Sequence, residues 1–125
     1  MTATTEHRKL TQAELVAEAR ERFGTDPLKW AFACPSCGDI ANGADFSEAL
    51  TKHPRAHVTG DEVIASDILG VECIGRTLGA LKGPQNQWKG RGCDWVAYGL
   101  FAGPWEIQLP DGRTKHAFPL APAPC

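Results

Sequence analysis

The stretch Trp30-Ala31-Phe32-Ala33-Cys34-Pro35-Ser36-Cys37-Gly38 decides how the rest of the chain is arranged. Large and small side chains alternate up to Ala33, which predicts a short strand, and the strand runs into a tight turn that carries two cysteines. Two sulfurs at this spacing can bind one side of a tetrahedral metal ion and leave two positions open. Pro35 fixes the turn, and Gly38 is free to adopt a positive φ that directs backbone amides toward the second sulfur. The stretch therefore predicts half of a metal site.

The remaining cysteines are the natural source of the other half. The chain has five cysteines, and in a reducing compartment clustered cysteines indicate metal binding or catalysis rather than disulfides. Cys73 and Cys93 complete the set if the strands that carry them lie side by side near the turn. We therefore expect a structural zinc site made of Cys34, Cys37, Cys73 and Cys93, with Cys125 as the spare thiol. Buried core cysteines and mixed cysteine–histidine ligation are the alternatives.

Composition places the chain among ordinary globular proteins. It has 125 residues, of which 42% are hydrophobic and 22% charged, so we expect one domain with a core of its own. The net charge of −2 argues against a general electrostatic attraction to nucleic acid. No apolar run is long enough for a membrane span, and the first residues lack the apolar core of a signal peptide. A cytoplasmic protein without membrane contact is expected.

Local signals predict an α+β domain, with helices first and a small, mostly antiparallel sheet last. A capping box of Thr11 and Glu14 begins a helix that Gly24 ends. We expect further short helices over residues 45–52 and 61–69, a turn at 42–43, strands over 29–33, 70–76, 94–101, 105–109 and 114–118, and a hairpin turn at 110–113. The expected organisation is a flexible terminus (1–9), one zinc-binding domain (10–118) and a proline-rich tail (119–125).

The long loop 79–92 is the candidate interaction surface. It carries Lys82, Trp88, Lys89 and Arg91, a set of side chains able to contact phosphate and to stack on a base. Long loops in compact domains are often functional. The alternative is a solvated loop whose tryptophan packs back on the sheet.

Two catalytic interpretations are weaker. Cys34 and Cys37 have the spacing of a redox dithiol, but such a pair normally begins a helix, and residues 38–43 form a poor helix. Another kind of enzyme would need a polar cluster that the sequence does not define. Its candidate members are His53, His57 or His116 near Asp94 or Arg76.

Several motifs together resemble a known family. They are Lys29-Trp-Ala-Phe-Ala-Cys-Pro-Ser-Cys-Gly, Cys73-Ile-Gly-Arg, Gly92-Cys-Asp-Trp with Gly99-Leu-Phe, and the ending from Phe118 to Pro122. Over residues 29–122 the chain resembles an uncharacterised family of small zinc-ribbon-like proteins of bacteriophages and actinobacteria. The resemblance implies a phage or mobile-element origin and a zinc-ribbon-like cysteine set, and it implies no activity.

These observations predict a binding protein rather than an enzyme, because a site made of four thiolates is closed and lacks the open position of a catalytic zinc. We expect a small structural-zinc adaptor, which in a phage would inhibit or modulate a host protein. The low net charge favours a protein partner. A nucleic-acid-binding zinc module that uses loop 82–92 is the first alternative, and a thiol redox or other enzyme is the second.

Overall fold

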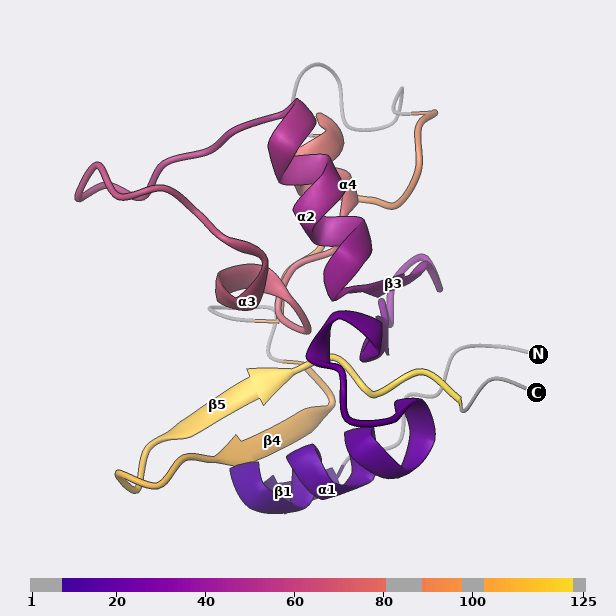
Figure 1. Cartoon of the computed structure of the whole chain (residues 1–125), viewed down its shortest axis with the longest axis vertical. Helices are drawn as coiled ribbons and strands as arrows, with labels where there is room; N and C mark the ends of the chain where they lie inside the picture. The colour runs from indigo at the N-terminus through magenta and orange to yellow at the C-terminus, as the bar shows by residue number, and fades with distance from the viewer. Residues whose placement is uncertain (1–7, 81–88, 98–102, 123–125) are drawn as a thin grey trace.

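The computed structural model describes residues 8–80, 89–97 and 103–122 of the chain. It confirms the α+β class, since short helices accompany two small sheets (Figure 1). In chain order the elements are β1 (Arg8–Thr11), α1 (Gln12–Phe23), the 3-10 helix η1 (Pro27–Lys29), β2 (Ala31–Ala33), β3 (Ile40–Asn42), α2 (Gly43–Lys52), α3 (Ala65–Ile68), α4 (Gly75–Leu78), β4 (Trp105–Gln108) and β5 (Thr114–Ala117).

The larger sheet has the strand order β1-β4-β5. Strands β4 and β5 form the predicted antiparallel hairpin, with Trp105 opposite Ala117. Strand β1 adds to β4 in parallel, with Arg8 opposite Trp105. Arg8 and Lys9 were expected in a flexible terminus, but they belong to this sheet. The Arg8 guanidinium stacks over the Trp105 ring at 4.6 Å, a cation–π contact that fixes the strand.

Helix α1 begins as predicted. The Thr11 side chain accepts a hydrogen bond from the Glu14 amide at 3.1 Å, and the Glu14 carboxylate accepts one from the Thr11 amide at 2.8 Å. This capping box satisfies two amides that the first turn leaves unpaired. Ala19 is buried, and Leu15 and Phe23 pack against the same core cluster. The helix therefore packs against the sheet.

Residues 119–121, expected in an extended tail, are part of the core. The Ala33 amide donates to the Pro119 carbonyl at 2.9 Å, and the Ala121 amide donates to the Ala31 carbonyl at 2.9 Å. Leu120 is 2% exposed, and the Arg22 side chain of α1 donates to its carbonyl at 3.2 Å. This short segment pairs with β2 because its apolar side chains fill the space between β2 and α1.

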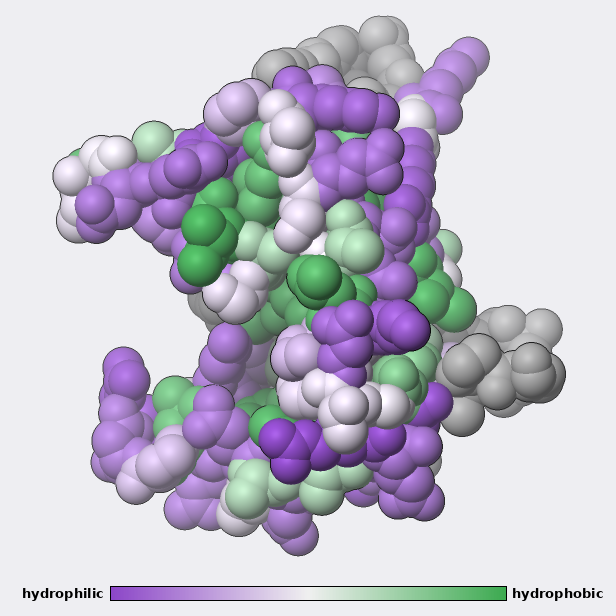
Figure 2. Space-filling model, viewed as in Figure 1, coloured by the Kyte–Doolittle hydropathy of each residue, from purple (hydrophilic) through white to green (hydrophobic). Residues whose placement is uncertain are grey.

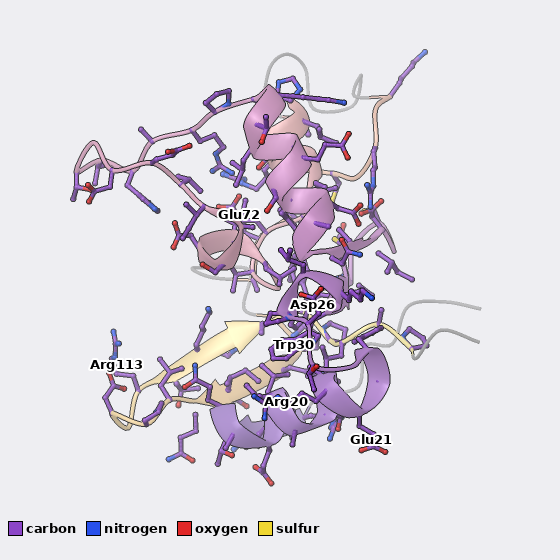
Figure 3. The ribbon with its side chains drawn as sticks, viewed as in Figure 1. Arg20, Glu21, Asp26, Trp30, Glu72 and Arg113 are labelled. Atoms are coloured by element: carbon purple, nitrogen blue, oxygen red, sulfur yellow. The ribbon has the colours of Figure 1, made fainter. Side chains whose placement is uncertain are left out.

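The Asp26-Pro27 turn continues into η1. The Asp26 carboxylate accepts from the Leu28 amide at 3.0 Å, and the Trp30 indole donates to the Gly24 carbonyl at 2.9 Å. Figure 3 shows Asp26 and Trp30 close together between α1 and the elements above it. These two bonds hold the start of the predicted strand in a turn, so β2 begins at Ala31 rather than at residue 29.

The predicted turn at Asn42-Gly43 is instead a helix start. Asn42 caps α2, since its side chain accepts from the Asp45 amide at 2.8 Å while the Asp45 carboxylate accepts from the Asn42 amide at 2.9 Å. Asn and Gly favour helix caps as well as turns. The turn prediction was wrong because Asp45, three residues after Asn42, completes a capping box that begins a helix.

The predicted helix 61–69 is reduced to α3, because the residues before it form a narrow hairpin. The Val63 amide donates to the Arg55 carbonyl at 3.0 Å, and the His57 amide donates to the Asp61 carbonyl at 2.8 Å. Gly60 turns the chain with a φ of 93°, a value that L-residues adopt at a cost. Only the second half of the predicted helix is helical.

The predicted strands 70–76 and 94–101 reduce to one bridge in the described residues, between Glu72 and Val96. The Cys73 amide donates to the Trp95 carbonyl at 3.0 Å, so the two segments do lie side by side. The chain then turns into α4, which begins at Gly75. The prediction of two strands was therefore wrong, but the expected contact between the two segments is present. Residues 98–101 lie outside the described part.

Two clusters of buried side chains divide the interior. One joins the sheet, α1 and β2, and the other joins α2, α3 and α4. Figure 2 shows the surface hollowed between these halves, on the side of α3 and the β4–β5 hairpin. Cys34 and Cys73 belong to the first cluster, and Ile74, the next residue, belongs to the second. The cysteines therefore lie where the two halves meet.

Candidate metal centre

Four cysteine sulfurs come together in the structure. The Sγ atoms of Cys34, Cys37, Cys73 and Cys93 all lie within 4.8 Å of one another. The distance is 3.7 Å between Cys34 Sγ and Cys93 Sγ, and 3.6 Å between Cys37 Sγ and Cys73 Sγ. Four sulfurs at about 2.3 Å from a tetrahedral zinc ion are about 3.8 Å apart. The cluster therefore has the dimensions of a thiolate metal site, and within the described residues it is the one group of Cys, His, Asp and Glu side chains with such dimensions.

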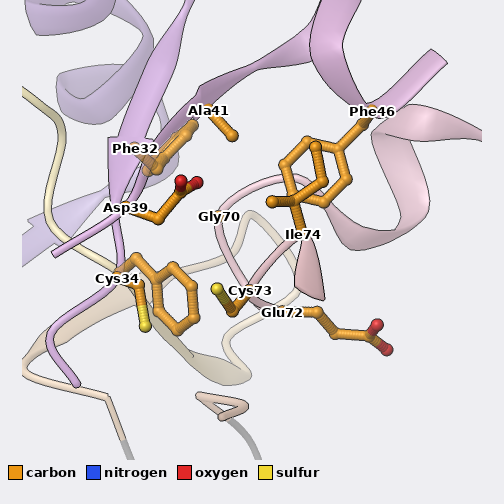
Figure 4. A pocket seen from close by; sticks show the side chains of 10 residues that line it. Phe32, Cys34, Asp39, Ala41, Phe46, Gly70, Glu72, Cys73 and Ile74 are labelled. Atoms are coloured by element: carbon orange, nitrogen blue, oxygen red, sulfur yellow. The ribbon is translucent and has the colours of Figure 1, made fainter. Parts of the chain in front are cut away.

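The four cysteine residues differ in their exposure to solvent. Cys34 and Cys73 are 1% and 2% exposed, Cys93 is half-buried and Cys37 is exposed. Figure 4 shows Cys34 and Cys73 beside Phe32 and Ile74, with apolar side chains from both halves of the molecule around them. The cluster is thus closed on its inner side and reaches solvent at Cys37.

The first pair of cysteines lies in the turn between β2 and β3. The Cys34 amide donates to the Asp39 carbonyl, and the Gly38 amide donates to the Cys34 carbonyl, both at 2.9 Å. Gly38 has a φ of 80°, which confirms the predicted positive φ. The antiparallel pairing of Ala33 with Ile40 joins the two ends of the turn. Local hydrogen bonds alone therefore orient both sulfurs.

The second pair depends on two glycines in contact. A methyl group built on Gly92 would lie 2.7 Å from the Gly75 nitrogen and 2.9 Å from Cys73 Sγ. Gly92 also has a φ of 75°. One built on Gly75 would overlap the backbone of Cys93. Because neither glycine has a side chain, the backbones approach closely enough for Cys73 and Cys93 to share one site.

Each of the four sulfurs faces a backbone amide from the residue two positions further along the chain. These amides belong to Ser36, Asp39, Gly75 and Trp95, and the Trp95 amide lies 3.4 Å from Cys93 Sγ. The Cys93 amide adds a bond to Cys73 Sγ at 3.1 Å. Amide donors favour the ionised form of an acceptor, and such bonds orient metal ligands. These backbone amides therefore suit sulfurs that are ionised, as metal-bound thiolates are.

The thiols ionise unequally in the metal-free chain, because four sulfurs this close do not all carry charge. A hydrogen bond from the Cys34 thiol, with amides of Gly75 and Cys93, lowers the pKa of Cys73 to about 5. The same bond and burial raise the pKa of Cys34 far above its ordinary value. Desolvation raises the pKa of Cys37 to about 12, and the neighbouring Cys73 adds to the rise. One thiolate at Cys73 is thus present before any metal binds.

Arg91 connects the two halves of the cluster. Its guanidinium donates to the Asp39 carboxylate at 2.9 Å and to the Ile40 carbonyl at 2.8 Å, and it lies 3.6 Å from the Asp45 carboxylate. These contacts raise the pKa of Arg91 further, chiefly through the bond to Asp39. A residue proposed for the interaction loop thus holds the segment before Cys93 against the Cys34–Cys37 turn.

The other loop candidates are placed only in part. Lys89 is exposed, while Lys82 and Trp88 lie outside the described residues. The described residues therefore do not show a surface shared by these four side chains. The use of the loop for interaction remains a prediction.

The three histidines in the described part of the chain do not join the cysteine cluster. His57 lies 3.0 Å from the Asp67 carboxylate, and His116 Nδ1 lies 3.3 Å from the Gly103 carbonyl. His53 follows α2 as its C-terminal cap. Mixed cysteine–histidine ligation is therefore not what the described residues present.

A buried ion pair beside Cys73 was missed in the sequence. Glu72 is 5% exposed, and its carboxylate accepts from Arg55 at 2.9 Å and lies 3.7 Å from the Arg76 guanidinium. Arg76 also donates to the Asp94 carbonyl at 2.8 Å, next to Cys93. Figure 3 shows Glu72 in the half that contains α2 and α3. A glutamate in the apolar run Val71-Glu72-Cys73-Ile74 was the available signal, because such a residue needs a partner when buried.

The fold and the cluster define a small α+β protein with a four-cysteine site that has the dimensions to bind a metal. Comparison with protein families identifies the family. The model of the VVA0879-like family matches residues 11–121, so the chain belongs to that family. The match includes α1, which lies outside the motifs discussed above. Neither curated proteins nor solved structures gave a match. Within the described residues, no helix has both the length and the apolar character needed to cross a membrane.

Proposed function

We propose that the protein binds one structural zinc ion through Cys34, Cys37, Cys73 and Cys93. The observation that carries the proposal is the approach of four sulfurs to tetrahedral ligand distances, each with an amide donor. Zinc suits a four-thiolate set, has no redox chemistry of its own and tolerates a closed site. The ion would tie the segments of the two core clusters together, so that part of the free energy of folding comes from metal binding.

The role supported best is binding to a partner rather than catalysis. Four thiolates occupy all tetrahedral positions, so no position remains for a substrate. The Cys34–Cys37 dithiol interpretation has less support, because Cys73 and Cys93 bring two further sulfurs within 4.8 Å of both. In addition the turn leads into β3 rather than into a helix.

We propose a protein as the partner, in the cytoplasm, with the chain acting as an adaptor or as a phage-encoded modulator of a host protein. The net charge of −2 and the resemblance to phage proteins support this. The nucleic-acid alternative loses support at Arg91, whose guanidinium is engaged by Asp39 and Asp45.

Metal content is the test. Protein purified without added metal is analysed for metals, and its thiols are titrated before and after chelation. One zinc per chain, four thiols that react only after chelation and one that reacts throughout would support the proposal. The Cys125→Ser variant should abolish the fifth thiol and keep the zinc. No bound metal, with five thiols reactive from the start, would overturn it.

A further inference from the structure

Within the described residues, β5 has one neighbouring strand, β4, and its outer edge is open. The bond from the Leu109 amide to the Arg113 carbonyl, 2.8 Å, sets the register of the hairpin. Alternate residues of an antiparallel strand therefore bond to β4, and the main-chain groups of Thr114 and His116 point away from it. Among the described residues, no backbone hydrogen bond satisfies these outward groups.

This edge borders a cleft of about 590 Å³. Four consecutive residues, 113–116, line one side of it, and Asp67 and Val71 line the other, with Leu109 between them. Figure 1 shows β5 facing α3 across this space, and Figure 2 shows the hollow. Consecutive lining residues mean that the backbone of β5, and not only one row of side chains, is presented to the cleft.

Pairing along this edge has already begun inside the molecule. Just past the end of β5, the Phe118 amide donates to the Gly70 carbonyl at 2.7 Å. Gly70 follows α3 closely in the chain, and the residues after it lead to α4, so this segment does not continue along β5. The edge thus accepts a neighbouring chain at one end and is left open at Thr114 and His116, where an added strand would extend the same sheet.

The charge on the strand edge itself favours an acidic residue beside Lys115. Arg113 is paired with Asp111 at 2.7 Å. Asp67, on the facing wall, lies 3.0 Å from His57 Nε2 and accepts from the Ile64 amide at 3.0 Å, and it keeps its negative charge. Lys115 is exposed and has no ion pair with another described residue. The uncompensated charge on the edge is therefore positive, and two copies of β5 side by side would bring two such lysines together, which disfavours self-pairing.

We propose that the β5 edge binds an extended, acidic segment of a partner protein as an added strand. The main-chain groups of Thr114 and His116 would hold its backbone, and Lys115 would contact its carboxylates. This inference adds a contact surface to the proposed binding role and does not depend on which metal is bound.

The test is a selection from a random 12-residue peptide library, displayed against the metal-loaded full-length protein. We expect enrichment of peptides rich in Asp, Glu and β-branched residues. The enriched peptides should lose at least about tenfold in affinity for Thr114→Pro, which removes an outward donor and spares the β4 ladder. In the wild-type protein they should slow hydrogen exchange of the His116 amide.

A second variant distinguishes a specific loss of peptide binding from misfolding. Lys115→Glu keeps every backbone group and should discriminate against the acidic peptides. No enrichment, equal binding to Thr114→Pro in its folded form, or enrichment of basic peptides would overturn the inference. So would a concentration-dependent dimer that Thr114→Pro abolishes, because the occupant would then be a second copy. Zinc content measured on each variant separates these outcomes from failure of the metal proposal.

Discussion

The two pairs of cysteines reach the same site by different means. Cys34 and Cys37 lie in one turn, held by bonds among residues 34–39 and closed by the β2–β3 pairing. Cys73 and Cys93 come from distant segments, which approach because Gly75 and Gly92 touch. The first pair would keep much of its geometry in a short peptide, whereas the second exists only when both core clusters have formed. Substitutions and titrations can break or sharpen this difference.

The largest effect is expected from Gly92→Ala. The new methyl group would overlap the Gly75 backbone and Cys73 Sγ, and the residue would also adopt an unfavourable φ of 75°. Overpacking and left-handed backbone together cost about 3 kcal/mol or more. We expect loss of zinc and a strong decrease in the unfolding midpoint in urea.

Gly38→Ala is the matched control. Gly38 has a similar φ of 80°, but a methyl group built at this position would meet nothing within 4 Å. The cost should therefore be the backbone penalty of about 1–2 kcal/mol, with zinc retained. Equal effects of the two substitutions would mean that the glycine contact does not determine the second pair.

Glu72→Ala should be the next most damaging change. It leaves Arg55 and Arg76 without their buried carboxylate beside Cys73, and breaking such a pair costs about 3–5 kcal/mol when fully buried. Because Arg55 is 30% exposed, we expect about 2–3 kcal/mol, measured by urea unfolding of the metal-loaded protein. Glu48→Ala, which removes an exposed pair with Lys52, should change stability by less than about 0.5 kcal/mol.

Arg91→Ala should weaken the connection between the pairs. The guanidinium binds Asp39 and the Ile40 carbonyl across the cluster, and loss of an outer contact of this kind lowers metal affinity about tenfold or more. Competition with a coloured chelator measures the change. Lys89→Ala serves as the control, and an equal loss of affinity in both variants would contradict a specific role for Arg91.

The smallest expected effect is on the number of protons that zinc binding releases. Because the pKa of Cys73 is about 5, that sulfur is ionised at pH 7 before metal binds, while the raised pKa values of Cys34 and Cys37 keep those thiols protonated. Zinc binding at pH 7 should therefore release fewer than four protons. Titration calorimetry in buffers of different ionisation enthalpy counts them.

The same shift sets the pH dependence of the metal-free fold. A pKa lowered from its ordinary value of 9.0 to about 5 means that the folded state holds fewer protons than the unfolded state between these values. The contribution of Cys73 to stability is complete above about pH 9 and is lost as pH falls through 5. A release of four protons at pH 7, or stability that falls with rising pH in this range, would contradict the assignment of the thiolate to Cys73.

The sequence predicted the local half of the site better than the distant half. Residue spacing gave Cys34, Cys37 and the positive φ of Gly38, because these depend on a few adjacent residues. The choice of Cys73 and Cys93 rested on counting thiols, and the strands expected to carry them proved to be a single bridge and a short helix. Their approach depends on the Gly75–Gly92 contact, which joins segments far apart in sequence.

The same limit applies to the fold. Capping residues predicted the start of α1, and the turn signal predicted the β4–β5 hairpin. The parallel strand β1 and the burial of Leu120 were missed, because both depend on pairing with segments more than 80 residues away. Arg91 was assigned to a free loop for the same reason: its carboxylate partners lie some 50 positions earlier.

The unequal exposure of the four cysteines has a kinetic consequence. Cys34 and Cys73 are shielded by apolar side chains, but Cys37 reaches solvent. An incoming chelator, or a protein that delivers metal, would displace the Cys37 ligand first and meet the buried sulfurs only afterwards. The lifetime of the bound ion would then depend on how often this one ligand detaches.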